Sequence, residues 1–258
     1  MGCRIHNVTI LFLKNHAAII TLFLKPLYLN IIAMNKKLFL IIFICGFTIH
    51  TKAQSSAIDS VAVSILDNMS AMIGDLTSCS VTVNANYDVH NQELGLVKRS
   101  NESQVFLQGP DKLLIRSEGD KGDRDFYYAD NLLTYYSPTR NHYAQLETVP
   151  TTVGMIDTVS KQYGILFPAA DFLYPGFVDD ILADAKNLVY LGITKVAGKD
   201  CFHIAGTTSD KTFQFWISDD AFSLPAKLVI VYTKKDMNPQ YVAVYSDWKI
   251  NTVFPDAL

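Results

Sequence analysis

The sequence feature that most restricts the fold is a regular alternation of side chains between residues 79 and 90. Apolar or small residues alternate there with polar ones: Cys79, Val81, Val83, Ala85, Tyr87 and Val89 against Ser80, Thr82, Asn84, Asn86, Asp88 and His90. Successive side chains of a strand point to opposite faces of its sheet, so this pattern predicts a long strand with one buried face. That face needs an apolar cover.

Further strand-like segments follow in two groups, separated by residues typical of turns. The first group is 97–108, 112–117, 124–129, 132–137 and 142–147, and the second is 188–196, 199–205, 211–218, 225–233 and 240–251. Turn formers such as Gly109-Pro110-Asp111 and Asp130-Asn131 lie between them. Closely spaced strands with short connections indicate an antiparallel meander.

Helical spacing appears at the start of this region and between the two groups of strands. Apolar residues recur every three or four positions from Ile58 to Ile73, which predicts a helix capped by Ser55 or Ser56 and ended by Gly74. A second helix is expected over 150–164, and a shorter one begins near Phe177.

The order of elements indicates an α+β fold that is mostly β. So many consecutive strands usually curl into a barrel or a sandwich, and the apolar stripes of the helices also need cover. We expect a curved antiparallel sheet of about 11 strands that forms an incomplete barrel, with the helices covering its concave face.

The first 53 residues have a different composition, because they contain no Asp or Glu. Lys36 and Lys37 precede an apolar stretch at 38–47, and Thr51 and Ala53 place small residues where a signal peptidase requires them. We expect a signal peptide that starts at Met34 and is cleaved after Ala53, with residues 1–33 upstream of the true start. The protein would then be periplasmic or secreted.

Two other interpretations of this segment are weaker. A membrane anchor is disfavoured because Lys25-Pro26 interrupts the apolar stretch, so neither part reaches the ~20 residues that span a bilayer. Lipid attachment at Cys45 needs a small residue just before it, and that residue is Ile44.

Residues 54–258 are expected to form a single domain with an acidic surface. They keep all 25 acidic residues but only 16 of the Lys and Arg, which gives a net charge of −9. An acidic surface repels phosphate backbones and anionic lipid headgroups, so we expect neither nucleic-acid binding nor electrostatic docking to membranes. We expect no membrane span in this domain.

Several local motifs resemble one family of uncharacterised, predicted periplasmic proteins in the lipoprotein-carrier (LolA/LolB-like) superfamily. They lie at 110–113, 133–138, 141–144, 190–203, 215–219, 224–232, 239–241 and 248, and together the resemblance covers nearly all of residues 55–255. It implies an incomplete antiparallel barrel with helices as a lid over an apolar cavity. It also implies carrying or sensing of lipids, and it transfers no catalytic residue.

No motif for catalysis, a metal or a cofactor is present in the sequence. The three His after residue 53 do not have zinc-ligand spacing. Cys201 and His203 are two residues apart, but a buried Cys beside a strand His is a better interpretation than a nucleophile pair. The acidic residues between 118 and 130 favour a solvated turn over a calcium loop. Cys79 and Cys201 leave open a disulfide, which the envelope would permit.

The favoured hypothesis is a protein that binds a lipid, an acyl chain or another hydrophobic ligand between sheet and helices. Inward strand positions supply the candidate lining residues: Val81, Val83, Tyr87, Leu113, Ile115, Phe126, Tyr128, Phe213, Phe215 and Ile217. The alternative is a non-catalytic interaction or structural protein whose helices fill the core, because every sheet needs its apolar face covered. An unrecognised hydrolase ranks third. The sequence does not identify a protein partner.

Overall fold

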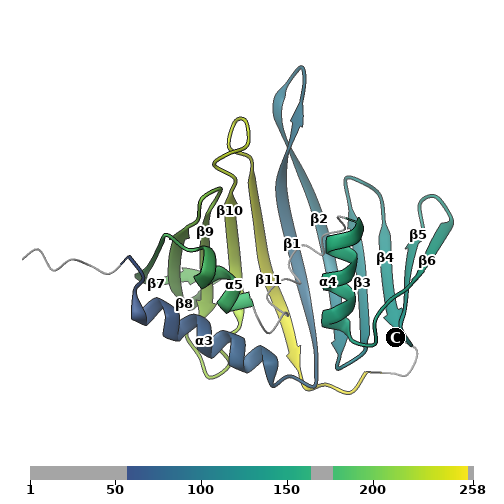
Figure 1. The fold of residues 1–258 in the computed structure, drawn as a ribbon, viewed down its shortest axis with the longest axis horizontal. Helices are drawn as coiled ribbons and strands as arrows, with labels where there is room; N and C mark the ends of the chain where they lie inside the picture. The colour runs from purple at the N-terminus through teal and green to yellow at the C-terminus, as the bar shows by residue number, and fades with distance from the viewer. Residues whose placement is uncertain (1–56, 164–176, 255–258) are drawn as a thin grey trace, which may run out of the picture. The chain divides into compact units, whose positions relative to one another are not determined.

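The computed structural model describes residues 57–163 and 177–254, which are built around one open antiparallel sheet of eleven strands (Figure 1). The order across the sheet is β6-β5-β4-β3-β2-β1-β11-β10-β9-β8-β7. The two edges, β6 and β7, do not pair with each other, so the sheet is not closed into a barrel. The predicted signal peptide and its cleavage after Ala53 lie outside the described residues.

The two groups of strands form the two halves of this sheet. The first half contains β1 (Ser78–Asn91), β2 (Gly95–Gln108), β3 (Lys112–Gly119), β4 (Arg124–Ala129), β5 (Leu132–Ser137) and β6 (His142–Glu147). The second contains β7 (Asn187–Val196), β8 (Lys199–Thr207), β9 (Thr212–Ser218), β10 (Pro225–Val231) and β11 (Gln240–Ile250). The halves join where β1 pairs with β11. The predicted strands and their antiparallel meander are thus confirmed.

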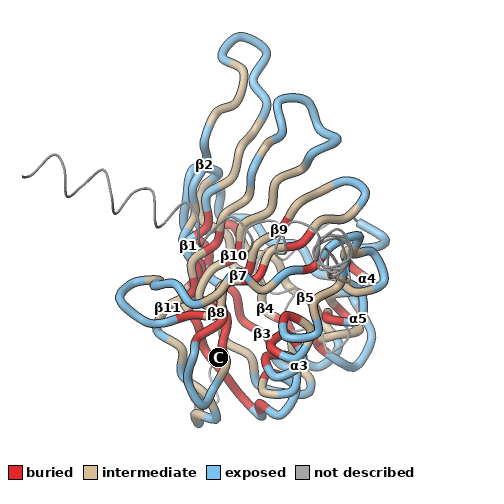
Figure 2. The backbone as a smooth tube through the Cα atoms, turned by 90° about the vertical axis from the view of Figure 1, so that its left-hand side faces the viewer, coloured by how far each residue is buried: buried red, intermediate tan, exposed pale blue. Residues whose placement is uncertain are grey.

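Among the described residues, three helices cover one face of the sheet. They are α3 (Ser60–Gly74), α4 (Thr152–Tyr163) and α5 (Phe177–Asp184). Figure 2 shows all three on the same side of the strands. We call this side the helix-covered face and the opposite side the outer face.

The core lies between this face and the helices, because both present their apolar stripes there. Leu66 and Met69 of α3 and Met155 of α4 are fully buried. They belong to one cluster with Val83 of β1 and Ile204 of β8, which come from opposite halves of the sheet. One continuous core therefore serves both halves.

The start of α3 differs from the prediction. The N-cap is Asp59, not Ser55 or Ser56, and Ile58 lies before the helix in a parallel bridge to Leu188. Asp59 donates its N–H to the carbonyl of Leu188, and Leu188 donates to Ala57. The residues before α3 thus pair with part of the edge strand β7, which shields main-chain groups that an edge leaves open.

Leu114 is an apolar residue on the outer face that is nevertheless buried. By alternation it shares that face with Lys112 and Arg116, yet it is only 2 % exposed. Phe106 and Tyr127 lie directly beside it on the neighbouring strands. Phe254 packs edge-on against Phe106, with the ring centroids 5.7 Å apart. The C-terminal segment therefore helps to cover a small apolar area of the outer face.

Asp59 links the helix α3 to the edge strand. Its Oδ1 accepts the N–H of Val61 at 2.8 Å, and its Oδ2 accepts the N–H of Tyr190 at 3.2 Å. The hydrogen bonds from Val61 and Tyr190 lower the pKa of the Asp59 carboxyl. A carboxyl with a lowered folded-state pKa stabilises the fold above its unfolded pKa, and that stabilisation is lost as the pH falls through the folded pKa.

We expect Asp59→Asn to lower the melting temperature at pH 7. The asparagine keeps one acceptor for the helix N-terminus, but its amide nitrogen cannot accept from Tyr190. The difference from wild type should shrink progressively once the pH falls below the unfolded-state pKa of about 4, and it should vanish as the pH passes through the lowered folded-state pKa of the carboxyl. Thermal unfolding followed by circular dichroism measures both effects, and equal melting temperatures at pH 7 would contradict the linking role.

Candidate ligand-binding cavity

A cavity of about 600 Å³ lies between the second half of the sheet and two of the helices. Its floor is formed by Phe213 and Phe215 of β9, Leu228 and Ile230 of β10, and Tyr245 of β11. All five lie on the helix-covered face, so the floor is almost entirely apolar. The volume is within the ~300–1,000 Å³ that is typical of small-molecule sites.

The roof of the cavity comes from α4 and α5. Ile156 of α4 and Phe177 and Ile181 of α5 line it. Phe177 meets the ring of Phe215 edge-on, with the centroids 5.6 Å apart. This aromatic contact joins the roof of the cavity to its floor.

Charged side chains surround this apolar interior. Asp157 and Lys161 of α4 form an ion pair at 2.8 Å, and Asp180, Asp184 and Lys211 also line the cavity. The pair between Asp157 and Lys161 is exposed and contributes little to stability. An apolar interior with a charged rim suits an amphiphile, whose chain can be buried while its polar end stays at the rim.

The shape of the floor depends on a close contact between β8 and β9. Gly206 lies directly opposite Phe213 in the strand register. A Cβ added to Gly206 would fall 2.2 Å from the Cζ of Phe213. The absence of a side chain at position 206 therefore lets the Phe213 ring lie across β8.

Two of the ten predicted lining residues, Phe213 and Phe215, line this cavity. The other eight lie elsewhere on the same face. Val81, Val83, Leu113, Ile115, Tyr128 and Ile217 are in the core cluster, and Phe126 packs against it. Tyr87 is partly exposed, with the Lys121 Nζ 5.2 Å from the centre of its ring.

Sequence reasoning missed the lining residues from α4, α5, β10 and β11. Leu228 and Ile230 alternate with Lys227 and Val229, so the period-2 pattern contained a signal for them. Ile181 gave none, because a helix as short as α5 has too few turns to define which face is inward. Residues 164–176, part of the aromatic-rich middle of the chain, lie outside the described residues.

Cys79 and Cys201 are buried free thiols, so the disulfide left open by the sequence is not formed. Cys79 is in the core cluster. Cys201 alternates with Phe202 and Ile204, which face that cluster, and so it lies on the outer face. The sheet itself separates the two sulfur atoms. Burial raises the pKa of Cys79 to about 11 and also raises the pKa of Cys201.

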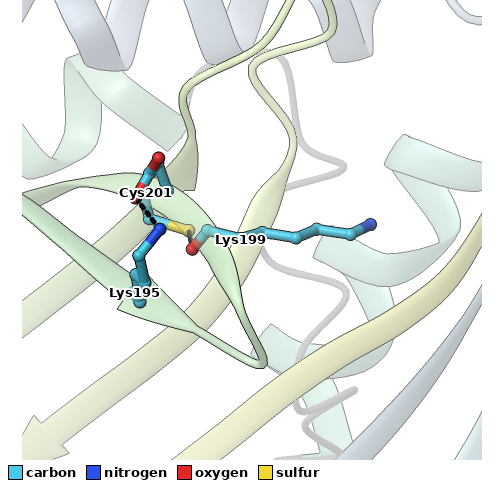
Figure 3. A network of polar contacts seen from close by, with 4 residues as sticks. Lys195, Lys199 and Cys201 are labelled. Carbon is cyan, nitrogen blue, oxygen red and sulfur yellow. Dashed lines mark hydrogen bonds and ion pairs between the residues drawn. The ribbon is translucent and has the colours of Figure 1, made fainter.

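Cys201 and His203 share the outer face but do not act on each other. The Cys201 thiol donates to the carbonyl oxygen of Lys199 at 3.6 Å, and Figure 3 shows these two residues in the β7–β8 hairpin. The His203 Nε2 lies 3.0 Å from the Oε1 of Gln214, and its ring stacks on Trp216 with the centroids 4.2 Å apart. These contacts fit a buried Cys beside a strand His.

The acidic residues around the β3–β4 turn have local roles. Asp120 accepts the N–H of Ser100 at 2.7 Å, and Asp125 accepts the hydroxyl of Tyr127 at 3.2 Å. Within residues 57–163 and 177–254, no three His, Cys, Asp or Glu side chains are grouped so that they could hold a metal ion.

Comparison with known proteins assigns the chain to a family. The family model described as "Predicted periplasmic protein (DUF2092)" matches residues 62–258. The chain belongs to this family. The family resemblance inferred from the local motifs is confirmed, and the family description agrees with the export expected from residues 34–53. No curated protein sequence matches the chain.

Solved structures of bacterial lipoproteins and related proteins are similar to the chain at low identity. Lipoprotein LppX of Mycobacterium tuberculosis has a TM-score of 0.48 and 15 % identity, over 74 % of this chain and 96 % of that one. LprF from Mycobacterium bovis has a TM-score of 0.45 and 15 % identity, and the match covers 77 % of this chain and 97 % of LprF. A LolA superfamily protein from Nitrosomonas europaea has a TM-score of 0.37 and 13 % identity, and the match covers 76 % of this chain and 96 % of that protein. Because these TM-scores are below 0.5, we assign the fold from the strand pairing within this chain and not from these similarities.

A helix that crosses a bilayer must be both long and apolar. None of α3, α4 and α5 is long and apolar enough to do so.

We expect Gly206→Ala to displace Phe213 and to destabilise the protein by about 1–3 kcal/mol, as overpacking of a core usually does. Gly74→Ala is the matched control, since a Cβ there has no heavy atom within 4 Å. Ala is favoured over Gly in a helix, so the control should be neutral or slightly stabilising. Urea unfolding measures both, and equal stabilities of the two variants would contradict the close contact.

We expect both thiols to resist alkylation in the folded protein. The thiolate is the reactive form, and at pH 8 a pKa of about 11 keeps it scarce at Cys79, where burial also blocks the reagent. Iodoacetamide followed by peptide mass mapping should label Cys79 and Cys201 only after denaturation. Labelling of Cys79 in the native protein as fast as in urea would contradict this burial.

Proposed function

We propose that this periplasmic protein binds a lipid, an acyl chain or another hydrophobic ligand in the cavity between β9–β11 and α4–α5. The observation that supports it is an apolar space of about 600 Å³ between sheet and helices, with charged side chains at its rim. A fully packed core would not contain such a space, because protein interiors normally leave few voids larger than a water molecule.

Binding would be driven by burial of the ligand's apolar surface. Each buried methylene contributes ~0.8 kcal/mol, so a chain with ten buried methylenes gains roughly 8 kcal/mol before the cost of association is subtracted. Phe213 and Phe215 supply flat apolar contacts, and Ile181 closes the opposite side. No group in the cavity needs to react with the ligand, so the proposed role is binding or transfer without catalysis.

A second candidate function is docking of a protein partner at the edge strand β7. Beyond the part of β7 that pairs with residues 57–59, Leu191 and Ile193 are 53 % and 55 % exposed. Apolar residues grouped on an open sheet edge are suited to pairing with another chain. Size-exclusion chromatography with light scattering tests whether this edge pairs with a second copy, and a monomer at every concentration would count against self-pairing.

We expect Ile181→Lys to weaken binding of a fluorescent fatty acid by at least about tenfold, because it places a charge against the buried chain. Ile193→Lys introduces the same charge on an exposed residue outside the cavity lining and should bind as wild type does. Fluorescence titration measures both affinities. No uptake by the wild-type protein, or equal affinities of the two variants, would contradict the proposed site.

A further inference from the structure

A row of polar residues crosses the helix-covered face of the first half of the sheet. In the strand register Ser103 of β2 lies beside Ser117 of β3, and Ser117 lies beside Arg124 of β4. Ser137 of β5 is paired with His142 of β6 and lies on the same face. The row is next to apolar core positions of the same strands, so it is a polar part of an otherwise apolar face.

The serines of this row are buried and carry an ordered hydrogen-bond network. Ser103, Ser117 and Ser137 are 8 %, 6 % and 4 % exposed. The Asn101 Nδ2 donates to Ser103 Oγ at 3.0 Å and to Ser117 Oγ at 3.3 Å, and Ser103 Oγ donates to Ser117 Oγ at 3.0 Å. With Ser103 as the donor, the Ser117 hydroxyl accepts two hydrogen bonds and can turn its own proton toward a ligand.

Arg124, the neighbour of Ser117, has an unused donor as well. Its Nε is buried and has no hydrogen-bond acceptor in the part of the chain that the structure describes. None of the ion pairs among those residues includes Arg124. The residue as a whole is only partly buried, so solvent reaches part of it. A buried donor on a charged group is costly unless an acceptor is supplied.

A second cationic side chain lies at this end of the face. Lys121 lies over the Tyr87 ring, which alternation places on the helix-covered face. The nearby carboxylates of Glu102 and Glu118 lie opposite each other on the outer face, where they cannot compensate Arg124 directly. Arg124 therefore has no carboxylate partner among the described ion pairs, which favours an anionic ligand.

We propose that Arg124 and Ser117 form a binding site for an oxyanion, a carboxylate or a phosphate, on the helix-covered face. The guanidinium offers donors in a fork that matches the oxygens of both groups, and the Ser117 hydroxyl adds one more donor beside it. The anion supplies the acceptor that the buried Nε lacks. This site is distinct from the cavity, whose lining does not include Arg124.

The anion has two possible sources, the headgroup of an amphiphile or a free anion. Dodecanoate and dodecanol differ only in the polar end, so their comparison reports on a headgroup. Inorganic phosphate reports on a free anion. The cavity proposal is tested separately by dodecanol, which needs only the apolar space.

The test uses the protein purified from the periplasm and follows thermal unfolding during a phosphate titration, with ionic strength held constant by chloride. A ligand that binds only the folded state raises the melting temperature. The wild-type protein should show a saturable rise with phosphate, and Arg124→Gln should show none. Arg116→Gln is the matched control, because Arg116 is exposed on the outer face of the adjacent strand. It should respond as wild type does.

Two further measurements test whether the guanidinium itself binds the anion and whether that anion is a headgroup. Arg124→Lys retains the charge but removes the fork, and it should bind phosphate at least about tenfold more weakly, as expected for loss of a charge-assisted hydrogen bond. If a headgroup occupies the site, Arg124→Gln weakens dodecanoate binding and leaves dodecanol binding unchanged. The proposal is overturned if neither phosphate nor dodecanoate stabilises the wild-type protein beyond chloride, or if Arg124→Gln responds as Arg116→Gln does.

Discussion

Burial of the apolar face of the open sheet is the constraint on which the rest of the structure depends. A closed barrel can cover its own interior, but a sheet whose edges β6 and β7 stay apart must cover that face with other elements. The helices α3, α4 and α5 provide this cover. Where Met155 and Val159 of α4 reach the sheet, the contact is complete and both side chains are fully buried.

Among the described residues, the helices leave a space over β9, β10 and β11, and this is where the cavity lies. Phe213 and Phe215 belong to the core cluster and also line the cavity, so the same residues stabilise the fold and form the floor. A cavity of this kind needs no specialised side chains. It arises because the helices are held at a distance that their own apolar residues do not fill.

Much of this architecture could be predicted from the sequence, because the alternation of apolar and polar side chains defines most of the strands. Alternation fixed which residues of β1 and β9 face inward, and the turn residues separated the strands, so strand positions were confirmed along both halves. The N-cap of α3 was predicted wrongly because Asp59 is selected by its contact with Tyr190, which is distant in sequence. Periodicity likewise cannot say that Leu114 is buried by Phe106 and Phe254, since that depends on where the C-terminal segment runs.

The site was harder to predict than the fold for a related reason. Alternation identifies the inward face but not which part of that face is left uncovered, and helix placement decides this. Phe213 and Phe215, which line the cavity, were therefore predicted together with eight residues that do not line it. Arg124 gave no signal in the sequence, because an arginine in a strand is unremarkable until its buried Nε is seen to lack an acceptor.

Photoaffinity labelling with a diazirine-bearing fatty acid tests the central claim most directly, because the reagent marks the residues that touch the chain. Peptide mapping should find the label on α5 and on β9 or β10, near Ile181, Phe215 and Leu228, and excess unlabelled fatty acid should abolish it. Label confined to the exposed edge strand β7, or spread without competition over the outer face, would contradict the account.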